Sequence, residues 1–147
     1  MKDTLTIRLA QVSDTPELLR LNDLFNDEGS NSLSAIEESL RSNEQEIVCV
    51  AADKDGLVGF CCGQIFKSMC YSVNYAKITE LFVLESYRRQ SVARELMAFI
   101  EAEFKKQGIH HFQLFTGKSN EAAQTFYRAQ GYIESPELMF RKRPADA

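Results

Sequence analysis

The segment from Glu80 to Arg94 has the residue types and spacing best suited to chemistry. A strand-like apolar stretch passes through a short polar turn directly into a helix-like stretch, and Arg88 and Arg89 lie at the turn. Such a junction leaves several backbone N–H groups unpaired at the positive end of a helix dipole. Together with the two guanidinium groups, they would suit an anion such as a pyrophosphate. An ordinary strand–helix turn with solvated arginines has the same composition and remains an alternative.

Hydrophobic periodicity and turn residues predict the elements that must position this segment. Strands are expected at Thr6–Leu9, Ile47–Ala52, Leu57–Ile65, Tyr75–Leu84 and His110–Thr116, with a short terminal strand at Leu138–Lys142. Helices are expected from Thr15 to Asn26, from a Ser34–Glu37 capping box to Arg41, from Val92 to Phe104 and from Asn120 to Gly131. We expect a hairpin turn at Asp53–Gly56 and a bulge in Tyr75–Leu84, where the apolar alternation is uneven. This order predicts one α/β (α+β) domain over residues 1–147, built around a mixed sheet.

Charge and composition exclude several classes of protein. The net charge of −4 argues against a nucleic-acid binder, which needs a basic surface. The longest apolar runs, such as Ile47–Ala52, are too short to span a bilayer, and Met1–Ile7 lacks the apolar core of a signal peptide. We therefore expect a cytoplasmic protein without nucleic-acid or membrane partners.

The four cysteines and two histidines do not form a metal-binding pattern. No C-x-x-C pair is present, and three of the cysteines lie in strand-like apolar stretches. The adjacent His110 and His111 would point to opposite faces of a strand. We expect buried, reduced thiols and no metal site.

Two motifs resemble those of a known family. The stretch Val83–Ala93 is similar to the CoA-binding motif of the GNAT superfamily of N-acetyltransferases, Q/R-x-x-G-x-G/A, with Arg88, Ser91 and Ala93 at its defining positions. The stretch Asn120–Tyr132 is similar to the family signature N-x-x-A-x-x-F-Y-x-x-x-G-F. The resemblance implies a GNAT-like fold, in which about four helices flank a mixed, mostly antiparallel central sheet.

The same resemblance implies acetyl-CoA as the co-substrate. The residues that it assigns to CoA binding are Leu81, Phe82, Val83, Arg88, Arg89, Gln90, Ser91, Val92, Ala93, Arg94, Asn120 and Tyr127. Plain helix capping explains Asn120 almost as well. Ser91 stands where the motif has its central glycine, so the strength of CoA binding stays open.

The implied reaction is transfer of an acetyl group to a primary amine by direct attack in a ternary complex. A lysine-like amine has a pKa of about 10.4 and is mostly protonated at neutral pH, so a base is useful. Glu80 is our candidate for this base, with a structural strand glutamate as its alternative. Tyr127 is the candidate acid for the departing thiolate, with aromatic packing as its alternative. A backbone N–H near Phe82 or Val83 would polarise the thioester carbonyl.

The acceptor is a small-molecule or peptide amine that the sequence does not identify, and a homodimer is compatible with the sequence. Acidic residues in the region of the first two helices could favour a cationic acceptor, although a solvated acidic face is the plainer explanation. These residues are Asp23, Asp27, Glu28, Glu37 and Glu38. An alternative function is a non-catalytic acyl-CoA-binding sensor or regulatory subunit with the same fold. Ser91 leaves that alternative open, and Tyr127 argues against it.

Overall fold

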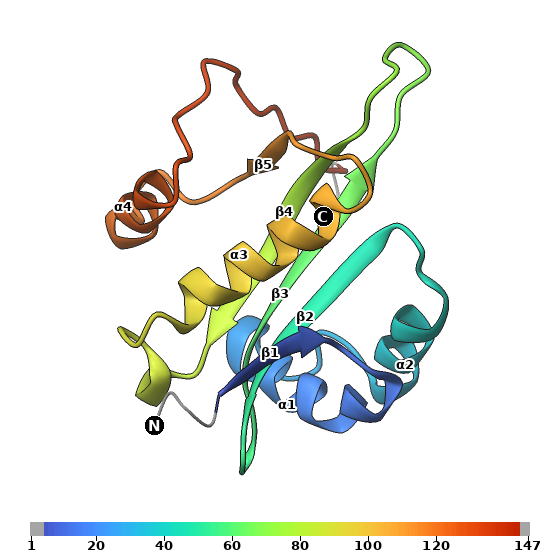
Figure 1. Cartoon of the computed structure of the whole chain (residues 1–147), viewed down its shortest axis with the longest axis vertical. Helices are drawn as coiled ribbons and strands as arrows, with labels where there is room; N and C mark the ends of the chain where they lie inside the picture. Colours follow the sequence, from blue (N-terminus) through green and yellow to red (C-terminus); the bar gives the residue numbers. More distant parts are fainter. Residues whose placement is uncertain (1–4, 145–147) are drawn as a thin grey trace. The chain divides into compact units, whose positions relative to one another are not determined.

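A five-stranded sheet in the order β1-β2-β3-β4-β5 forms the centre of the computed structural model, which describes residues 5–144 (Figure 1). The strands are β1 (Thr6–Leu9), β2 (Glu46–Asp53), β3 (Gly56–Phe66), β4 (Tyr75–Val83) and β5 (Phe112–Leu114). Neighbouring strands from β1 to β4 pair antiparallel, whereas β4 and β5 pair parallel. The predicted mixed, mostly antiparallel sheet is therefore confirmed.

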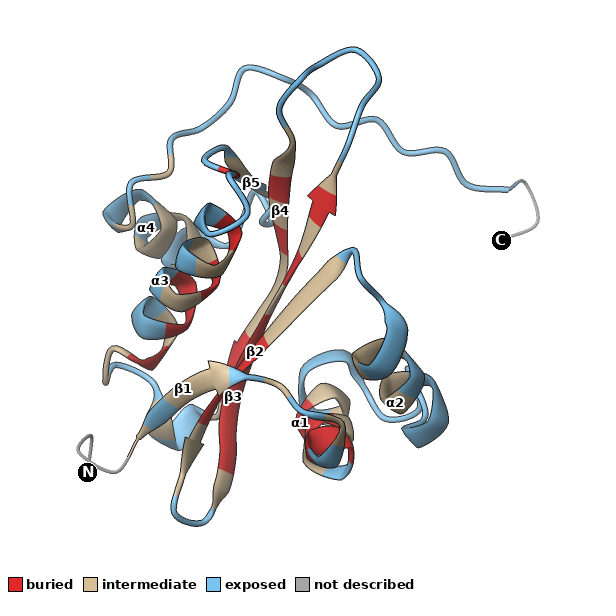
Figure 2. Cartoon of the chain, turned by 45° about the vertical axis from the view of Figure 1, so that its right-hand side comes forward, coloured by how far each residue is buried: buried red, intermediate tan, exposed pale blue. Residues whose placement is uncertain are grey.

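Helices cover both faces of this sheet. The helices α1 (Thr15–Asn26) and α2 (Leu33–Ser42) lie on one face, and α3 (Val92–Lys105) lies on the other (Figures 1 and 2). Two single turns of 3₁₀ helix, η2 (Val12–Asp14) and η3 (Glu85–Tyr87), precede α1 and α3. None of the helices within residues 5–144 is long and apolar enough to cross a membrane.

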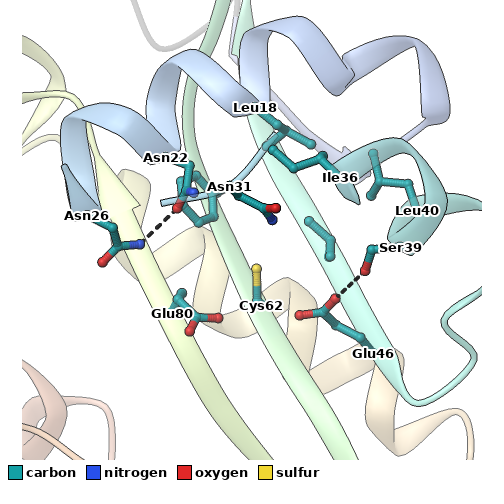
Figure 3. A pocket seen from close by; sticks show the side chains of 12 residues that line it. Leu18, Asn22, Asn26, Asn31, Ile36, Ser39, Leu40, Glu46, Cys62 and Glu80 are labelled. Carbon is teal, nitrogen blue, oxygen red and sulfur yellow. Dashed lines mark hydrogen bonds between the residues drawn. The ribbon is translucent and has the colours of Figure 1, made fainter. Parts of the chain in front are cut away.

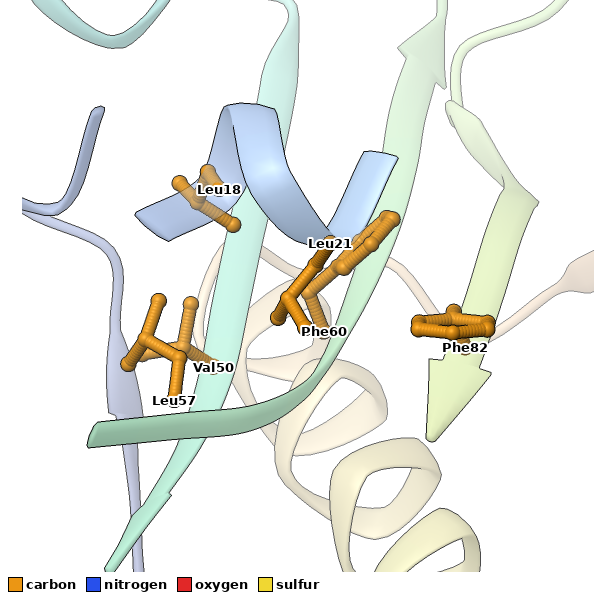
Figure 4. Close-up of a cluster of buried hydrophobic side chains, with 6 residues drawn as sticks. All are labelled: Leu18, Leu21, Val50, Leu57, Phe60 and Phe82. Atoms are coloured by element: carbon orange, nitrogen blue, oxygen red, sulfur yellow. The ribbon is translucent and has the colours of Figure 1, made fainter. Parts of the chain in front are cut away.

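Alternation along the strands divides the core between the two faces. On the α1 face, a buried cluster joins α1 to the sheet (Figure 4) and consists of Leu18, Leu21, Val50, Leu57, Phe60 and Phe82. On the opposite face, α3 buries Leu96, Ile100 and Phe104. A Cβ atom on Gly63 of β3 would lie only 2.7 Å from the ring of Phe104, so glycine allows α3 to pack directly on the strand.

The two local irregularities predicted in the sheet are both confirmed. The β2–β3 hairpin turns at Asp53–Gly56, where the Asp53 carboxylate accepts the N–H groups of Asp55 (2.8 Å) and Gly56 (3.1 Å). In β4, Glu80 pairs with Cys62 while Ile78 pairs with Gly63, so Thr79 is an extra, bulged residue.

Contacts along the chain divide it into two compact units, with the boundary between Phe115 and Thr116. The second unit contains α4 (Glu121–Ala129), which Asn120 caps by accepting the N–H of Ala123 (3.1 Å). The terminal strand predicted at Leu138–Lys142 is wrong, since residues 132–144 form neither helix nor strand. A strand needs a ladder partner, and the described part of this unit contains no other strand to supply one.

The start of α2 and the length of β5 also differ from the prediction. The capping box at Ser34 is wrong, because Ser32 is the N-cap of α2 and its hydroxyl accepts the N–H of Ala35 (3.2 Å). The strand predicted at His110–Thr116 is shorter, since only Phe112–Leu114 pairs with β4.

Candidate active site

Within the first unit, the described part of the chain leaves the outer edge of β4 open over half of its length. Within residues 5–115, β5 pairs with β4 only from Ala76 to Ile78. On the other edge, Leu84 N–H donates to Val58 O of β3 (2.8 Å), so alternate residues of this antiparallel ladder face β3. The peptide groups of Leu81 and Val83 consequently point to the open edge, where they could bond an extended ligand.

The open edge leads into a tight turn before α3. Ser91 is the N-cap of α3 and has a left-handed backbone (φ 69°), and Arg89 is also left-handed (φ 63°). Glu95 is the first residue whose N–H donates within the helix, to Ser91 O (3.0 Å). The N–H groups of Val92, Ala93 and Arg94 precede this ladder at the positive end of a 14-residue helix. This geometry suits an anion.

Side chains hold the turn in place. The Tyr87 hydroxyl donates to the carboxylate of Asp53, which ties the turn to the β2–β3 hairpin. This hydrogen bond raises the pKa of Tyr87 and lowers the pKa of Asp53. Arg88 donates from Nε to Val83 O (2.9 Å), and its guanidinium lies 5.9 Å from the centroid of the Phe82 ring.

Among the predicted CoA-binding residues of the first unit, some side chains bond the turn itself and others are exposed beside the start of α3. Arg88 stabilises the turn through Val83, and Gln90 donates to Ser86 O (3.1 Å). Arg89 and Arg94 are exposed, and Arg94 donates to the Ser91 hydroxyl (3.1 Å). The positive charges of Arg89 and Arg94 thus lie beside the start of α3.

The other two predicted residues, Asn120 and Tyr127, belong to the second unit. The side chain of Asn120 is the N-cap of α4, as described above. The ring of Tyr127 is half-buried between two edge-to-face neighbours, with its centroid 5.3 Å from that of Phe126 and 6.2 Å from that of Tyr132. The aromatic packing foreseen as an alternative for Tyr127 is present, and its role as an acid stays a prediction.

A cavity of about 230 Å³ lies between α1, α2 and the sheet (Figure 3). Glu80 of β4 lines it, as the base prediction requires. The other polar side chains that line it include Asn22, Asn26, Asn31, Glu46 and Cys62. None of the five acidic residues proposed from the sequence to shape an acceptor cleft lines this cavity; the acidic groups come from β2 and β4 instead.

The cavity floor concentrates negative charge. The reactive atoms of Glu46, Cys62 and Glu80 lie within 4.8 Å of one another, close enough to share a cation. Burial raises the pKa of Glu46, and the neighbouring Glu80 raises it further, although the Ser39 hydroxyl opposes this by donating to Glu46 (3.2 Å). Burial and the same two carboxylates hold the pKa of the Cys62 thiol well above its usual range. Cys62 is therefore a neutral thiol and a poor nucleophile.

Sequence reasoning missed Glu46, Cys62 and the three asparagines. Glu46 begins β2, whereas the predicted strand begins one residue later, at Ile47. The signal that could have found it is its two-residue spacing from Val48 and Val50, because Val50 lies in the core on the same face. Cys49 and Cys61 are buried free thiols as predicted, whereas Cys70 is exposed.

Comparison with known proteins identifies relatives of this architecture. The sequence profile of the acetyltransferase (GNAT) family matches residues 14–132. No curated protein sequence matches the chain.

Several solved structures share the fold. The aminoglycoside acetyltransferase meta-AAC0020 from an uncultured soil metagenomic sample, in complex with sisomicin, has a TM-score of 0.84 at 18% identity over 97% of this chain and 98% of its own. The structure of AAC(6')-Iy in complex with the bisubstrate analog CoA-S-monomethyl-acetylneamine has a TM-score of 0.83 at 20% identity over 96% and 99%. Glucosamine-6-phosphate N-acetyltransferase from Arabidopsis thaliana has a TM-score of 0.81 at 18% identity over 95% and 98%. At these identities the likeness establishes the fold.

Proposed function

The chain belongs to the acetyltransferase (GNAT) family, and we propose that it moves an acetyl group from acetyl-CoA to a primary amine by direct attack in a ternary complex. The observation that carries this proposal is the continuity of Glu80–Arg94. This one segment contributes a carboxylate to a cavity, two peptide groups to an open strand edge and the N–H groups at the start of α3. An acetyl-CoA-dependent transferase needs a base, a thioester site and a pyrophosphate site in this order.

The cofactor would follow the open edge of β4. The N–H groups of Val92, Ala93 and Arg94 would bind the pyrophosphate, and the exposed Arg89 would add charge. The pantetheine arm would bond the peptide group of Leu81 and the N–H of Val83, because Val83 O already accepts Arg88 Nε (2.9 Å). Because Val83 N–H points to the open edge and Phe82 N–H points to β3, Val83 is the better candidate to polarise the thioester carbonyl. Gln90 and Ser91 complete the part of the proposed cofactor site that the first unit supplies, and the family signature implies a CoA contact for Asn120 as well.

Proton transfer would need a base for the amine and an acid for the thiolate. Glu80 faces the cavity and accepts the Thr79 hydroxyl (2.6 Å), so its carboxylate is held on the acceptor side of β4. We assign the acid to Tyr127, as the family signature implies. The protonated state of Cys62 disfavours a covalent acyl-cysteine and supports direct attack by the amine.

Similar structures support a small-molecule amine as the acceptor. The aminoglycoside acetyltransferase meta-AAC0020 was solved with sisomicin, AAC(6')-Iy with an acetylneamine bisubstrate analog, and a third similar protein is a glucosamine-6-phosphate N-acetyltransferase. The cavity of about 230 Å³ suits a compact amine better than a folded peptide. We propose that the protein acts in the cytoplasm as one catalytic domain, and a homodimer remains compatible with this function.

Thiol release from acetyl-CoA with a panel of primary amines tests the proposal directly. We expect turnover with at least one small amine. We also expect Glu80→Gln to depress turnover most at low pH, where the free amine is scarcest, while calorimetry gives nearly unchanged CoA affinity. Glu85→Gln, an exposed change within the same segment just after β4, is the matched control. CoA binding without thiol release for any amine would favour the non-catalytic sensor, and a normal pH profile in Glu80→Gln would return Glu80 to a structural role.

A further inference from the structure

Two half-buried carboxylates face each other across the cavity floor without a basic partner. Glu46 comes from β2 and Glu80 from β4, and an oxygen of each lies within 4.8 Å of the other (Figure 3). Ser39 and Thr79 donate hydroxyl hydrogen bonds to them. Within residues 5–144, neither carboxylate takes part in an ion pair, and no lysine, arginine or histidine lines the cavity.

Uncompensated charges in a partly buried site favour a cationic ligand. Burial and then the charge of Glu80 raise the pKa of Glu46, since like charges at this separation repel through a medium less polar than water. A cation between or beside them would remove this repulsion. The side chains of Asn22, Asn26 and Asn31 on the opposite wall are neutral amides, so they add hydrogen-bonding capacity without adding positive charge.

Charge balance at the moment of attack distinguishes the roles of the two carboxylates. The reacting amine must be neutral, and in the proposed reaction its proton passes to Glu80, which then becomes neutral as well. Glu46 would keep its negative charge in the cavity throughout this step. A cation that stays charged during the reaction would balance the charge of Glu46, and the attacking amine cannot supply it.

We propose that Glu46 binds a second, non-reacting ammonium group of the acceptor, which makes the acceptor a compact molecule with two amino groups. This inference rests on the proposed function, because it takes Glu80 as the group that receives the proton. The two carboxylate oxygens lie within 4.8 Å of each other and charge-assisted N–H···O⁻ bonds are about 2.8 Å long, so two nitrogens bound to them lie no more than about 10 Å apart. Short diamines and amino sugars with neighbouring amino groups have this spacing.

Steady-state kinetics with matched acceptors tests this assignment. The series is 1,4-diaminobutane, 1-aminobutane and 4-amino-1-butanol, which share chain length but differ in the second charge, assayed with EDTA present to remove adventitious divalent ions. The wild-type protein should prefer the diamine in kcat/KM by about tenfold or more. Glu46→Gln should reduce this preference by about tenfold, mainly through KM, and Glu46→Asp should restore part of it. Glu44→Gln, an exposed change two residues away, should keep the wild-type preference.

The outcomes separate this inference from the proposed function. Two results would overturn the role of Glu46 and leave the acetyltransferase proposal intact. One is equal kcat/KM for monoamines and the diamine, and the other is an unchanged preference for the diamine in a folded Glu46→Gln protein. If no amine releases thiol, the proposed function fails, and calorimetry with 1,4-diaminobutane decides the inference. Binding that is lost in Glu46→Gln would support the ammonium site, whereas absence of binding to the wild-type protein would overturn it.

Discussion

Replacing Ser91 with glycine should stabilise the protein without weakening CoA binding. Ser91 occupies the place of the family's central glycine and keeps the left-handed backbone (φ 69°) that glycine adopts without steric cost. Its side chain makes no capping hydrogen bond to the start of α3, so glycine removes no cap, although it does remove the exposed hydrogen bond that Arg94 donates to the hydroxyl (3.1 Å). Serine at this position therefore has the strain of a left-handed backbone but lacks the hydrogen bond by which a serine N-cap usually stabilises a helix.

The expected gain is small but measurable. A non-glycine residue in the left-handed region costs about 1–2 kcal/mol. Glycine offsets part of this, about 0.5–1 kcal/mol, through the larger conformational entropy of the unfolded chain. The net stabilisation should be about 0.5–1 kcal/mol, which corresponds to a rise in Tm of about 1–4 °C for a chain of this size. CoA affinity should be equal or tighter, because a phosphate can approach the backbone more closely.

Thermal unfolding and calorimetry with CoA measure both effects. Ser91→Ala keeps the strain and should give no rise in Tm. Ser86→Gly is the matched control, because Ser86 precedes the same helix and its φ lies outside the left-handed region, so that glycine should lower Tm there. Equal shifts in Tm for Ser91→Gly and Ser86→Gly would refute the strain argument, and a loss of CoA affinity in Ser91→Gly would assign a binding role to the hydroxyl.

Three further outcomes follow from the site and the fold. The double charge reversal Arg88→Glu and Arg89→Glu should weaken CoA binding. Of the two changes, Arg88→Glu should also lower Tm, because it breaks the hydrogen bond to Val83 O. Unchanged CoA affinity in a folded double mutant would contradict the assignment of an anion site to this turn. Tyr127→Phe keeps the ring packing and should lower turnover by about 10²–10⁴-fold with little change in Tm. A rate within about threefold of wild type would mean that water or the amine, and not Tyr127, protonates the departing thiolate. Arg8 donates two hydrogen bonds to Asp14 (2.8 and 3.0 Å) and holds the pKa of this buried carboxyl below its usual value. The pair therefore stabilises the fold fully above the unfolded pKa of about 3.9. This stabilisation is lost as the pH falls through the lower pKa of the folded state. Urea unfolding should therefore give Asp14→Asn a loss of about 1.5–3 kcal/mol at pH 7 that shrinks below pH 4, and a loss independent of pH would contradict this origin.

Local signals in the sequence predicted those elements that depend on near neighbours. The Asp53–Gly56 turn is fixed by hydrogen bonds within four residues, and the α3 helix by its apolar spacing. The capping box at Ser34 failed because two serines compete for the same helix start. Ser32 has the extended backbone of an N-cap (φ −131°, ψ 161°), so its hydroxyl reaches the first turn.

The acceptor cavity was harder to predict, because pairing across the sheet assembles it. Glu46 and Glu80 are 34 positions apart in the sequence, and β3 brings them together by pairing with β2 on one side and β4 on the other. The motif located Glu80, but nothing near Glu46 in the sequence records this register. Cys62, between them on β3, appeared only as one more apolar strand residue.

The bulge at Thr79 explains how one strand serves both the cavity and the open edge. Ile78 pairs with Gly63 on the α3 side of the sheet, and in a regular strand Glu80 would share that face. The extra residue shifts the phase, so Glu80 turns toward the cavity and the peptide groups of Leu81 and Val83 turn away from β3. The Thr79 hydroxyl lies within hydrogen-bonding distance of both Cys62 O (3.3 Å) and Glu80 Oε1 (2.6 Å), so the bulged residue also holds the carboxylate in its new direction. A single inserted residue thereby turns the Glu80 carboxylate toward the cavity and the Val83 N–H, three residues further along β4, toward the open edge, so that one strand carries both a candidate base and a candidate thioester site.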